Sequence, residues 1–218
     1  MKRKIIISVG LIAIIIGIVC LVIFKVTPSP EINADSIIEP SAETGFIPEK
    51  IIGNPDEAKI VIYEYADYGC SHCASFNKTV NKLMEEHEGE IAVVFRSYIL
   101  GLFKNSTQAA RAATAAQIQG YFKEYKDLLF NNQAEWLYKD GSKLTEVLEN
   151  YFLIASNNLG DMDKFKEDMN SNPVKTRLKF EQSMGKKVNL EGTPTFRIDG
   201  EAIDLKRLEK IIEQKITR

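Results

Sequence analysis

The sequence predicts an α/β domain that is interrupted by an all-helical insertion and preceded by one transmembrane helix. A β-branched apolar run, a segment with helical apolar spacing and a second β-branched run follow one another over 60–98. From about residue 105 to 187 the composition changes to Ala, Gln, Leu, Lys and Glu with helical periodicity, and β-prone segments return over 195–203. An uncharged run at 5–24 precedes all of these segments.

The first part of the domain has the pattern of a strand–helix–strand unit. Ile60–Tyr65 is typical of a buried central strand. We expect a helix from Ser71 to about Glu88, ended at Gly89, and a second strand at Ile91–Tyr98. Because a helical crossover joins parallel neighbours, these two strands should be parallel.

Gly and Pro residues divide the expected insertion into separate helices. Asn105-Ser106 can cap the first of them, whose many alanines allow close helix packing. Beyond the insertion, Asp199-Gly200 is a hairpin signal. We expect helices at 107–119, 121–131, 143–157, 162–169, 174–187 and about 205–215, and short strands at 195–198 and 201–203.

The first 48 residues predict a basic tail, an anchor and a linker. Residues 1–4 are basic, and the uncharged residues 5–24 would span roughly 30 Å at about 1.5 Å per residue, the thickness of a bilayer core. Basic flanks stay in the cytoplasm, so the domain at 49–218 should be extracytoplasmic. Residues 25–48 contain four prolines and no regular period, which is typical of a linker. We therefore expect a single-pass protein of the cell membrane.

Two other arrangements of the N-terminus stay open. A cleaved signal peptide normally has an apolar core of about 7–15 residues and a small-x-small site, which Phe24-Lys25-Val26 does not offer. Lipid attachment at Cys20 is disfavoured because Val19 precedes it and the apolar run continues past it. In each arrangement the domain is exported to a compartment where disulfides persist.

The exported part is acidic. Four of the 28 Lys and Arg residues precede Val26, whereas all 30 Asp and Glu residues follow it, which leaves a net charge near −6. Nucleic acid is therefore disfavoured as a partner.

The chemistry is expected at Cys70-Ser71-His72-Cys73, where a helix should begin. Two thiols three positions apart lie one helical turn from each other, close enough to form a disulfide. We expect Cys70 to face solvent at the helix end, where unpaired N–H groups and the helix dipole favour its thiolate. Cys73 shares the inner, apolar face with Val80, so it is the expected resolving thiol.

Zinc binding and an inert structural disulfide are the alternatives for this motif. Structural zinc needs four ligands, and the other Cys and His residues are only Cys20, His72 inside the motif, and His87. The exported part has no further cysteine with which to build a disulfide scaffold. We therefore favour redox chemistry by the cysteine pair and expect no metal and no dissociable cofactor.

Five segments together carry a resemblance to a known family: 53–58 (GNPDEA), 65–73 (YADYGCSHC), 94–96 (VFR), 109–113 (AARAA) and 192–200 (GTPTFRIDG). From about residue 51 to the C-terminus the chain resembles the DsbA-like thiol:disulfide oxidoreductases. Cys-x-x-Cys paired with a distant Gly-Thr-Pro-Thr is the specific part of this resemblance. It implies a thioredoxin fold interrupted by a helical domain.

The resemblance implies a cis peptide bond between Thr193 and Pro194, beside the two cysteines. A cis turn would leave the main chain of Thr193 free to pair with an extended substrate, whereas an ordinary trans turn is the alternative. Ser71 stands where the strongest oxidants of the family have proline. We treat Ser71 and Thr193 as candidate substrate contacts and Pro194 as part of the catalytic site.

Glu64 and His72 are two further catalytic candidates. The resemblance places an acidic group at Glu64 under the buried cysteine, where burial would raise its pKa and let it accept the proton of Cys73. Glu64 is equally compatible with an exposed strand position. Protonated His72 would favour the Cys70 thiolate, stabilise the reduced form and make the disulfide a stronger oxidant.

These expectations describe an enzyme that introduces disulfides into exported proteins by exchange through Cys70 and Cys73. Its substrates would be reduced or unfolded polypeptides. The resemblance implies a membrane partner, DsbB-like or quinone-linked, that reoxidises the dithiol. A disulfide reductase or isomerase of the same fold is one alternative, and a peptide-binding or holdase module with the disulfide as a staple is the other.

Overall fold

A five-stranded sheet forms the centre of residues 33–217, the part of the chain that the computed structural model describes. In the order β1-β3-β2-β4-β5, its strands are Lys50–Ile52 (β1), Ile91–Ser97 (β3), Ile60–Ala66 (β2), Thr195–Ile198 (β4) and Glu201–Ile203 (β5). β2 and β3 are parallel, as the sequence predicts, and the other neighbours are antiparallel. The two most apolar strands therefore lie next to each other in the interior of the sheet, where both of their faces are covered.

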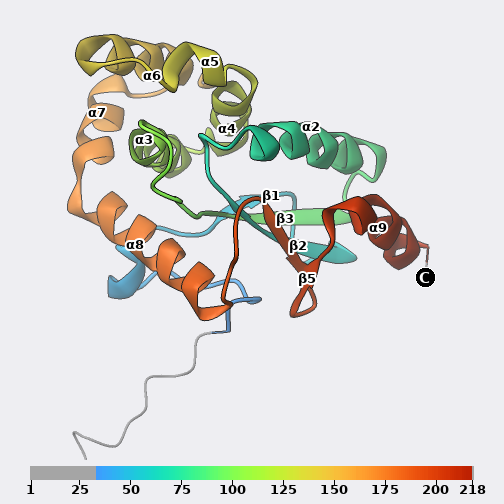
Figure 1. Ribbon diagram of the computed structural model, residues 1–218. Coiled ribbons are helices and arrows are strands. Elements are labelled where there is room, and N and C mark those ends of the chain that lie inside the picture. Colours follow the sequence, from blue (N-terminus) through green and yellow to red (C-terminus); the bar gives the residue numbers. More distant parts are fainter. Residues whose placement is uncertain (1–32, 218) are drawn as a thin grey trace, which may run out of the picture. The chain divides into compact units, whose positions relative to one another are not determined.

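Helices cover the sheet and form a lobe at one end of it (Figure 1). The helix that carries the cysteine motif, α2, lies over the sheet, and the chain returns from the lobe through α8. The helices are Ser71–Glu86 (α2), Ser106–Ile118 (α3), Phe122–Asn131 (α4), Gln133–Trp136 (α5), Gly141–Ala155 (α6), Met162–Asn170 (α7), Asn172–Lys187 (α8) and Leu208–Ile216 (α9), with short 3-10 helices at Ala42–Thr44 (η1) and Leu205–Arg207 (η2).

Most helix boundaries agree with the sequence to within two residues, and the differences have local causes. Asn157 and Asn158 adopt positive φ angles, which ends α6 at Ala155. Pro173 lies within the first turn of α8, where proline is tolerated, instead of breaking the chain before the helix. The helix α5 and the strand β1 were not predicted, because each is short and, unlike the hairpin of β4 and β5, is not marked by a hairpin signal in the sequence.

Residues 34–48 differ from the expected linker because they pack against the domain. Ala34 and Ile47 are buried, and Arg96 donates a hydrogen bond to the Ala34 carbonyl. Asp35 forms an ion pair with Arg197 at 2.8 Å. The predicted tail at 1–4 and anchor at 5–24 lie outside the described residues, and no helix within 33–217 has the length and apolar character needed to cross a membrane.

Aromatic side chains join the helical lobe to the sheet in one continuous core. Phe95 of β3 lies 5.4 Å from Phe122 of α4, measured between ring centroids. Tyr68, in the loop before the cysteine motif, stacks on Phe130 of α4 at 5.1 Å. The alanines of α3 that were expected to pack closely are fully buried. The lobe therefore braces the loop that leads into the motif.

Five fully buried charged side chains tie the N-terminal segment and α8 to the sheet. Glu49 binds Arg96 at 2.8 Å and also binds Arg177, while Glu181 binds Arg177 at 2.9 Å and also binds Lys50. Removing a charge from water is costly unless partners surround it, and here each carboxylate has two cationic partners. The two cations on Glu181 lower its pKa below the usual value, although burial alone would raise it.

Candidate active site

The two cysteines lie at the N-terminus of α2, as predicted, and both are free thiols. Cys70 is the N-cap residue, and the Ala74 N–H donates to its carbonyl to begin the helix. Cys70 is 6% exposed and Cys73 is completely buried. The expectation that Cys70 faces solvent is therefore wrong, because this residue is almost entirely buried. Cys70 is nevertheless the more accessible of the two thiols.

The loop before β4 lies against Cys70 and explains its low exposure. The Thr193–Pro194 peptide bond is cis, which confirms the prediction. The Cys70 thiol donates to the Thr193 carbonyl oxygen, with 3.5 Å between sulfur and oxygen. The main chain of Thr193 is thus not entirely free, because its carbonyl is already a partner of the protonated thiol. The structure thus brings Cys70 next to Thr193 and the cis proline, two predicted site residues that lie more than a hundred positions away in the sequence.

One carboxylate holds the loop that leads into Cys70. Asp67 accepts hydrogen bonds from the Gly69 N–H at 2.9 Å, from the Leu100 N–H at 2.8 Å and from the Ser106 hydroxyl. A Cβ atom at Gly69 would lie 2.4 Å from the Cβ of Phe103, so the close approach of this loop to the next one requires glycine. The backbone before Cys70 is therefore fixed by both packing and hydrogen bonds.

Gln133 of α5 holds the same loop from the side of the helical lobe. Its side-chain amide donates to the carbonyl oxygens of Tyr68, at 2.6 Å, and Cys70, at 3.0 Å. The unpredicted helix α5 thus contributes directly to the position of the motif.

Ser71 and His72 are the exposed residues of the motif. They occupy the first turn of α2, which contains no acidic side chain. A cation at His72 would therefore meet no counter-charge within that turn.

Burial raises the pKa of the Cys73 thiol well above its ordinary value, and the nearby Thr193 hydroxyl offsets part of this effect. Cys73 is consequently a protonated thiol at neutral pH in the reduced protein. Since the thiolate is the nucleophile in disulfide exchange, Cys73 requires a proton acceptor when it attacks.

Glu64 is completely buried in β2, so the exposed-strand alternative is wrong. Neither of its carboxylate oxygens has a hydrogen-bond partner within residues 33–217. Burial raises the pKa of Glu64 to about 7, although the positive charge of Lys126 acts in the opposite direction. A carboxyl group that titrates near neutral pH is suited to accept and return a proton.

A polar group of side chains next to Glu64 links α4 to α2. Lys126 is fully buried, and its Nζ lies 3.7 Å from Asp127 Oδ1. Asp127 accepts hydrogen bonds from Asn77 at 3.0 Å and Asn81 at 2.9 Å, both from α2. These amides and Lys126 lower the pKa of Asp127, although burial alone would raise it. Asp127 therefore stays ionised while Glu64 titrates.

The comparison with known families decides the classification. A sequence model described as Thioredoxin matches residues 47–214. The chain belongs to the thioredoxin family. Solved structures with this fold include oxidised BdbD from Bacillus subtilis, at 19% identity and a TM-score of 0.66 over 85% of this chain and 100% of that chain. Another is MdbA, a thiol-disulfide oxidoreductase from Corynebacterium diphtheriae, at 20% identity and a TM-score of 0.61 over 85% and 96%.

Curated relatives of this thioredoxin-family chain include a disulfide bond formation protein and sodium/proton antiporters. The "Probable disulfide bond formation protein D" of Bacillus cereus is 24% identical over 173 residues, which cover 75% of this chain and 77% of that protein. The "Na(+)/H(+) antiporter NhaA 3" of Salinispora tropica is 28% identical over 149 residues, so the match covers 68% of this chain but 21% of the antiporter. The chain therefore spans about a fifth of the length of that relative. The resemblance to DsbA-like proteins is confirmed at the level of family and fold.

Sequence reasoning missed Lys126, the buried cation whose positive charge lowers the pKa of Glu64. The signal was present, because Lys126 shares one face of α4 with the buried Phe122, Leu129 and Phe130. A lysine on an apolar helix face is expected to have a specific electrostatic role.

Proposed function

We propose that this thioredoxin-family protein is an extracytoplasmic disulfide oxidase that transfers its Cys70–Cys73 disulfide to reduced or unfolded exported polypeptides. The observation that supports the proposal is the contact between the Cys70 thiol and the carbonyl of Thr193, which precedes the cis proline. It places the more accessible sulfur beside the main-chain segment along which an extended polypeptide can pair.

Exchange proceeds in two steps in the oxidising direction. A substrate thiolate attacks Cys70 Sγ, which forms a substrate–Cys70 disulfide and breaks the bond between Cys70 and Cys73. Cys73 leaves as a thiolate, and protonated Glu64 is the proposed source of its proton through a bridging water, since neither Glu64 oxygen has a direct hydrogen-bond partner within residues 33–217. A second substrate thiolate then attacks the substrate sulfur of the mixed disulfide, which releases Cys70 as a thiolate and leaves the substrate oxidised by two electrons.

Reoxidation uses the same groups in reverse. The Cys70 thiolate attacks a disulfide of a membrane partner, DsbB-like or quinone-linked, and forms a mixed disulfide. Cys73 gives its proton through the same bridging water to ionised Glu64 and attacks Cys70 Sγ, which restores the Cys70–Cys73 bond and releases the partner as a thiolate, reduced by two electrons. The basic tail and the uncharged run at 5–24 would keep the domain next to that partner at the cell membrane.

The test is the equilibrium of the cysteine pair with glutathione buffers. We expect the reduction potential to lie above the value of about −270 mV that is typical of thioredoxin. A value at or below that of thioredoxin would reject the oxidase and favour a reductase. A disulfide that resists exchange altogether would favour the peptide-binding or holdase module.

Location requires a separate measurement. Protease added to spheroplasts should digest the domain, because the proposed topology places it outside the membrane. Complete protection would reject the topology, and release of a shortened soluble protein would reject the uncleaved anchor.

A further inference from the structure

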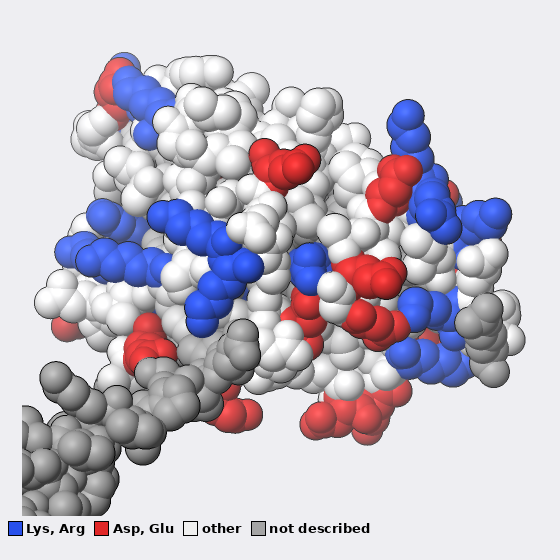
Figure 2. Space-filling model, turned by 60° about the horizontal axis from the view of Figure 1, so that its bottom comes forward, with Lys and Arg blue, Asp and Glu red and all other residues white. Residues whose placement is uncertain are grey.

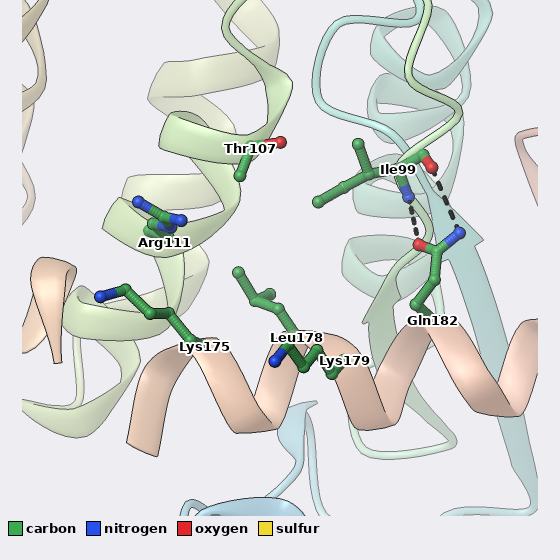
Figure 3. A pocket seen from close by; sticks show the side chains of 7 residues that line it. All are labelled: Ile99, Thr107, Arg111, Lys175, Leu178, Lys179 and Gln182. Atoms are coloured by element: carbon green, nitrogen blue, oxygen red, sulfur yellow. Dashed lines mark hydrogen bonds between the residues drawn. The ribbon is translucent and has the colours of Figure 1, made fainter. Parts of the chain in front are cut away.

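A pocket of about 300 Å³ lies between α3 and α8, and the proposed exchange reaction does not use it (Figure 3). Its size is at the lower end of the range for sites that take small ligands or single side chains. The pocket is lined by side chains of four kinds, cationic, apolar, hydroxyl and amide: Arg111, Lys175 and Lys179; Ile99 and Leu178; Thr107; and Gln182.

Among the described residues, no carboxylate pairs with the three cations of the pocket. Within residues 33–217, the side chains of Arg111, Lys175 and Lys179 take part in no ion pair. Arg177, on the same helix, binds both Glu49 and Glu181 on the opposite side. Figure 2 turns the bottom of the molecule forward and shows Lys and Arg side chains gathered on the left and on the right of this face, with Asp and Glu side chains between them. An anion would therefore complete the site.

The remaining lining makes the pocket amphipathic. Figure 3 shows Ile99, Thr107 and Leu178 around the middle of the pocket, with Arg111 and Lys175 at one side. Leu178 is 7% exposed and forms an apolar floor. Gln182 is a fixed wall, because its amide exchanges two hydrogen bonds with the Ile99 backbone, at 2.9 and 3.2 Å.

Both walls of the pocket adjoin the loop that positions Cys70. Leu100, next to Ile99, donates to Asp67, and so does Ser106, next to Thr107. The same carboxylate accepts the Gly69 N–H. A ligand in the pocket would thus contact the segments that hold the redox loop.

We propose that this pocket docks an acidic segment of a polypeptide that approaches the dithiol. A carboxylate would bind Arg111, Lys175 and Lys179, and the neighbouring aliphatic side chain would contact Leu178. Charge complementarity supports an anionic occupant, and the concave apolar floor favours a projecting side chain over a flat membrane surface. The proposal rests on the proposed function, which makes polypeptides the substrates and partners of the enzyme.

The experiment uses a fluorescein-labelled peptide of Leu, Glu and Ser without cysteine, titrated into the full-length protein and followed by fluorescence anisotropy. The R111Q/K175Q variant should bind it more weakly by on the order of tenfold, since two half-buried cations that would contact the carboxylate are lost. The matched control is K143Q/K210Q, which removes two exposed, unpaired lysines from α6 and α9. Peptides with Gln in place of Glu, or Ser in place of Leu, test the anionic and apolar contacts separately.

Loss of binding in R111Q/K175Q alone, together with weaker binding of both altered peptides, would support the proposal. Equal losses in the control variant, or equal binding of the Gln peptide, would overturn it. Binding of anionic phospholipid vesicles through the same residues without peptide binding would also overturn it, in favour of a membrane surface. The glutathione equilibrium of each variant is measured in parallel, so that absence of exchange rejects the proposed function independently of the pocket.

Discussion

Replacing Glu64 by Gln should stabilise the reduced protein at alkaline pH and leave its stability almost unchanged in acid. The folded protein raises the pKa of Glu64 from 4.5 to about 7, mainly through burial. Each pKa unit corresponds to about 1.4 kcal/mol, so ionised Glu64 costs the folded state about 3 kcal/mol. Because the folded state binds this proton more tightly than the unfolded chain, the cost is absent below about pH 4.5, grows between pH 4.5 and 7, and is complete above pH 7.

The assay is urea unfolding of wild type and Glu64→Gln, both fully reduced, at about pH 4 and pH 8. The stability difference between the two proteins should increase by about 3 kcal/mol from the lower to the higher pH. Glu146→Gln, at an exposed position of α6, is the control and should show no such increase. A difference between wild type and Glu64→Gln that does not change with pH would refute the argument that Glu64 is ionised at a cost.

Three further substitutions test the site. Cys73→Ser should accumulate mixed disulfides on non-reducing gels and Cys70→Ser should not, because Cys73 is completely buried and Cys70 is partly accessible; equal adducts would reject these roles. His72→Ala should lower the reduction potential in glutathione buffers, because a cation that favours the thiolate is lost, and an unchanged potential would remove His72 from the mechanism. Gly69→Ala should lower the free energy of unfolding by roughly 1–3 kcal/mol, since its Cβ would overlap Phe103; an unchanged urea midpoint would mean that this loop can shift.

The parts of the fold that the sequence predicts well are those with local patterns. The β2–α2–β3 unit and the hairpin of β4 and β5 follow from periodicity and turn chemistry within short windows. β1 has only three residues and includes the buried Lys50, whose partner Glu181 lies 131 positions away. The packing of residues 34–48 depends on similarly distant partners, and no local pattern indicates it.

The candidate site shows the same division between local and distant information. Cys70, Cys73 and Pro194 were predictable from motifs, whereas the strand pattern left the burial of Glu64 open and only the family resemblance favoured it. Residues on alternate faces of a strand differ in exposure only when one face meets solvent, and β2 is covered on both faces. The loop that covers Cys70 lies more than a hundred residues away in the sequence. The low exposure of Cys70 therefore could not be predicted from the neighbouring sequence.

The buried charges around Glu49 have a practical consequence for making this protein without its apolar N-terminus. A shortened chain that begins at Ile51, where the sequence resemblance begins, would lack both Glu49 and Lys50. Arg96 and Arg177 would then keep buried positive charges with fewer partners, a loss that typically costs several kcal/mol. A soluble version for crystallisation or assay should therefore start before Ala34, so that the whole packed segment is retained.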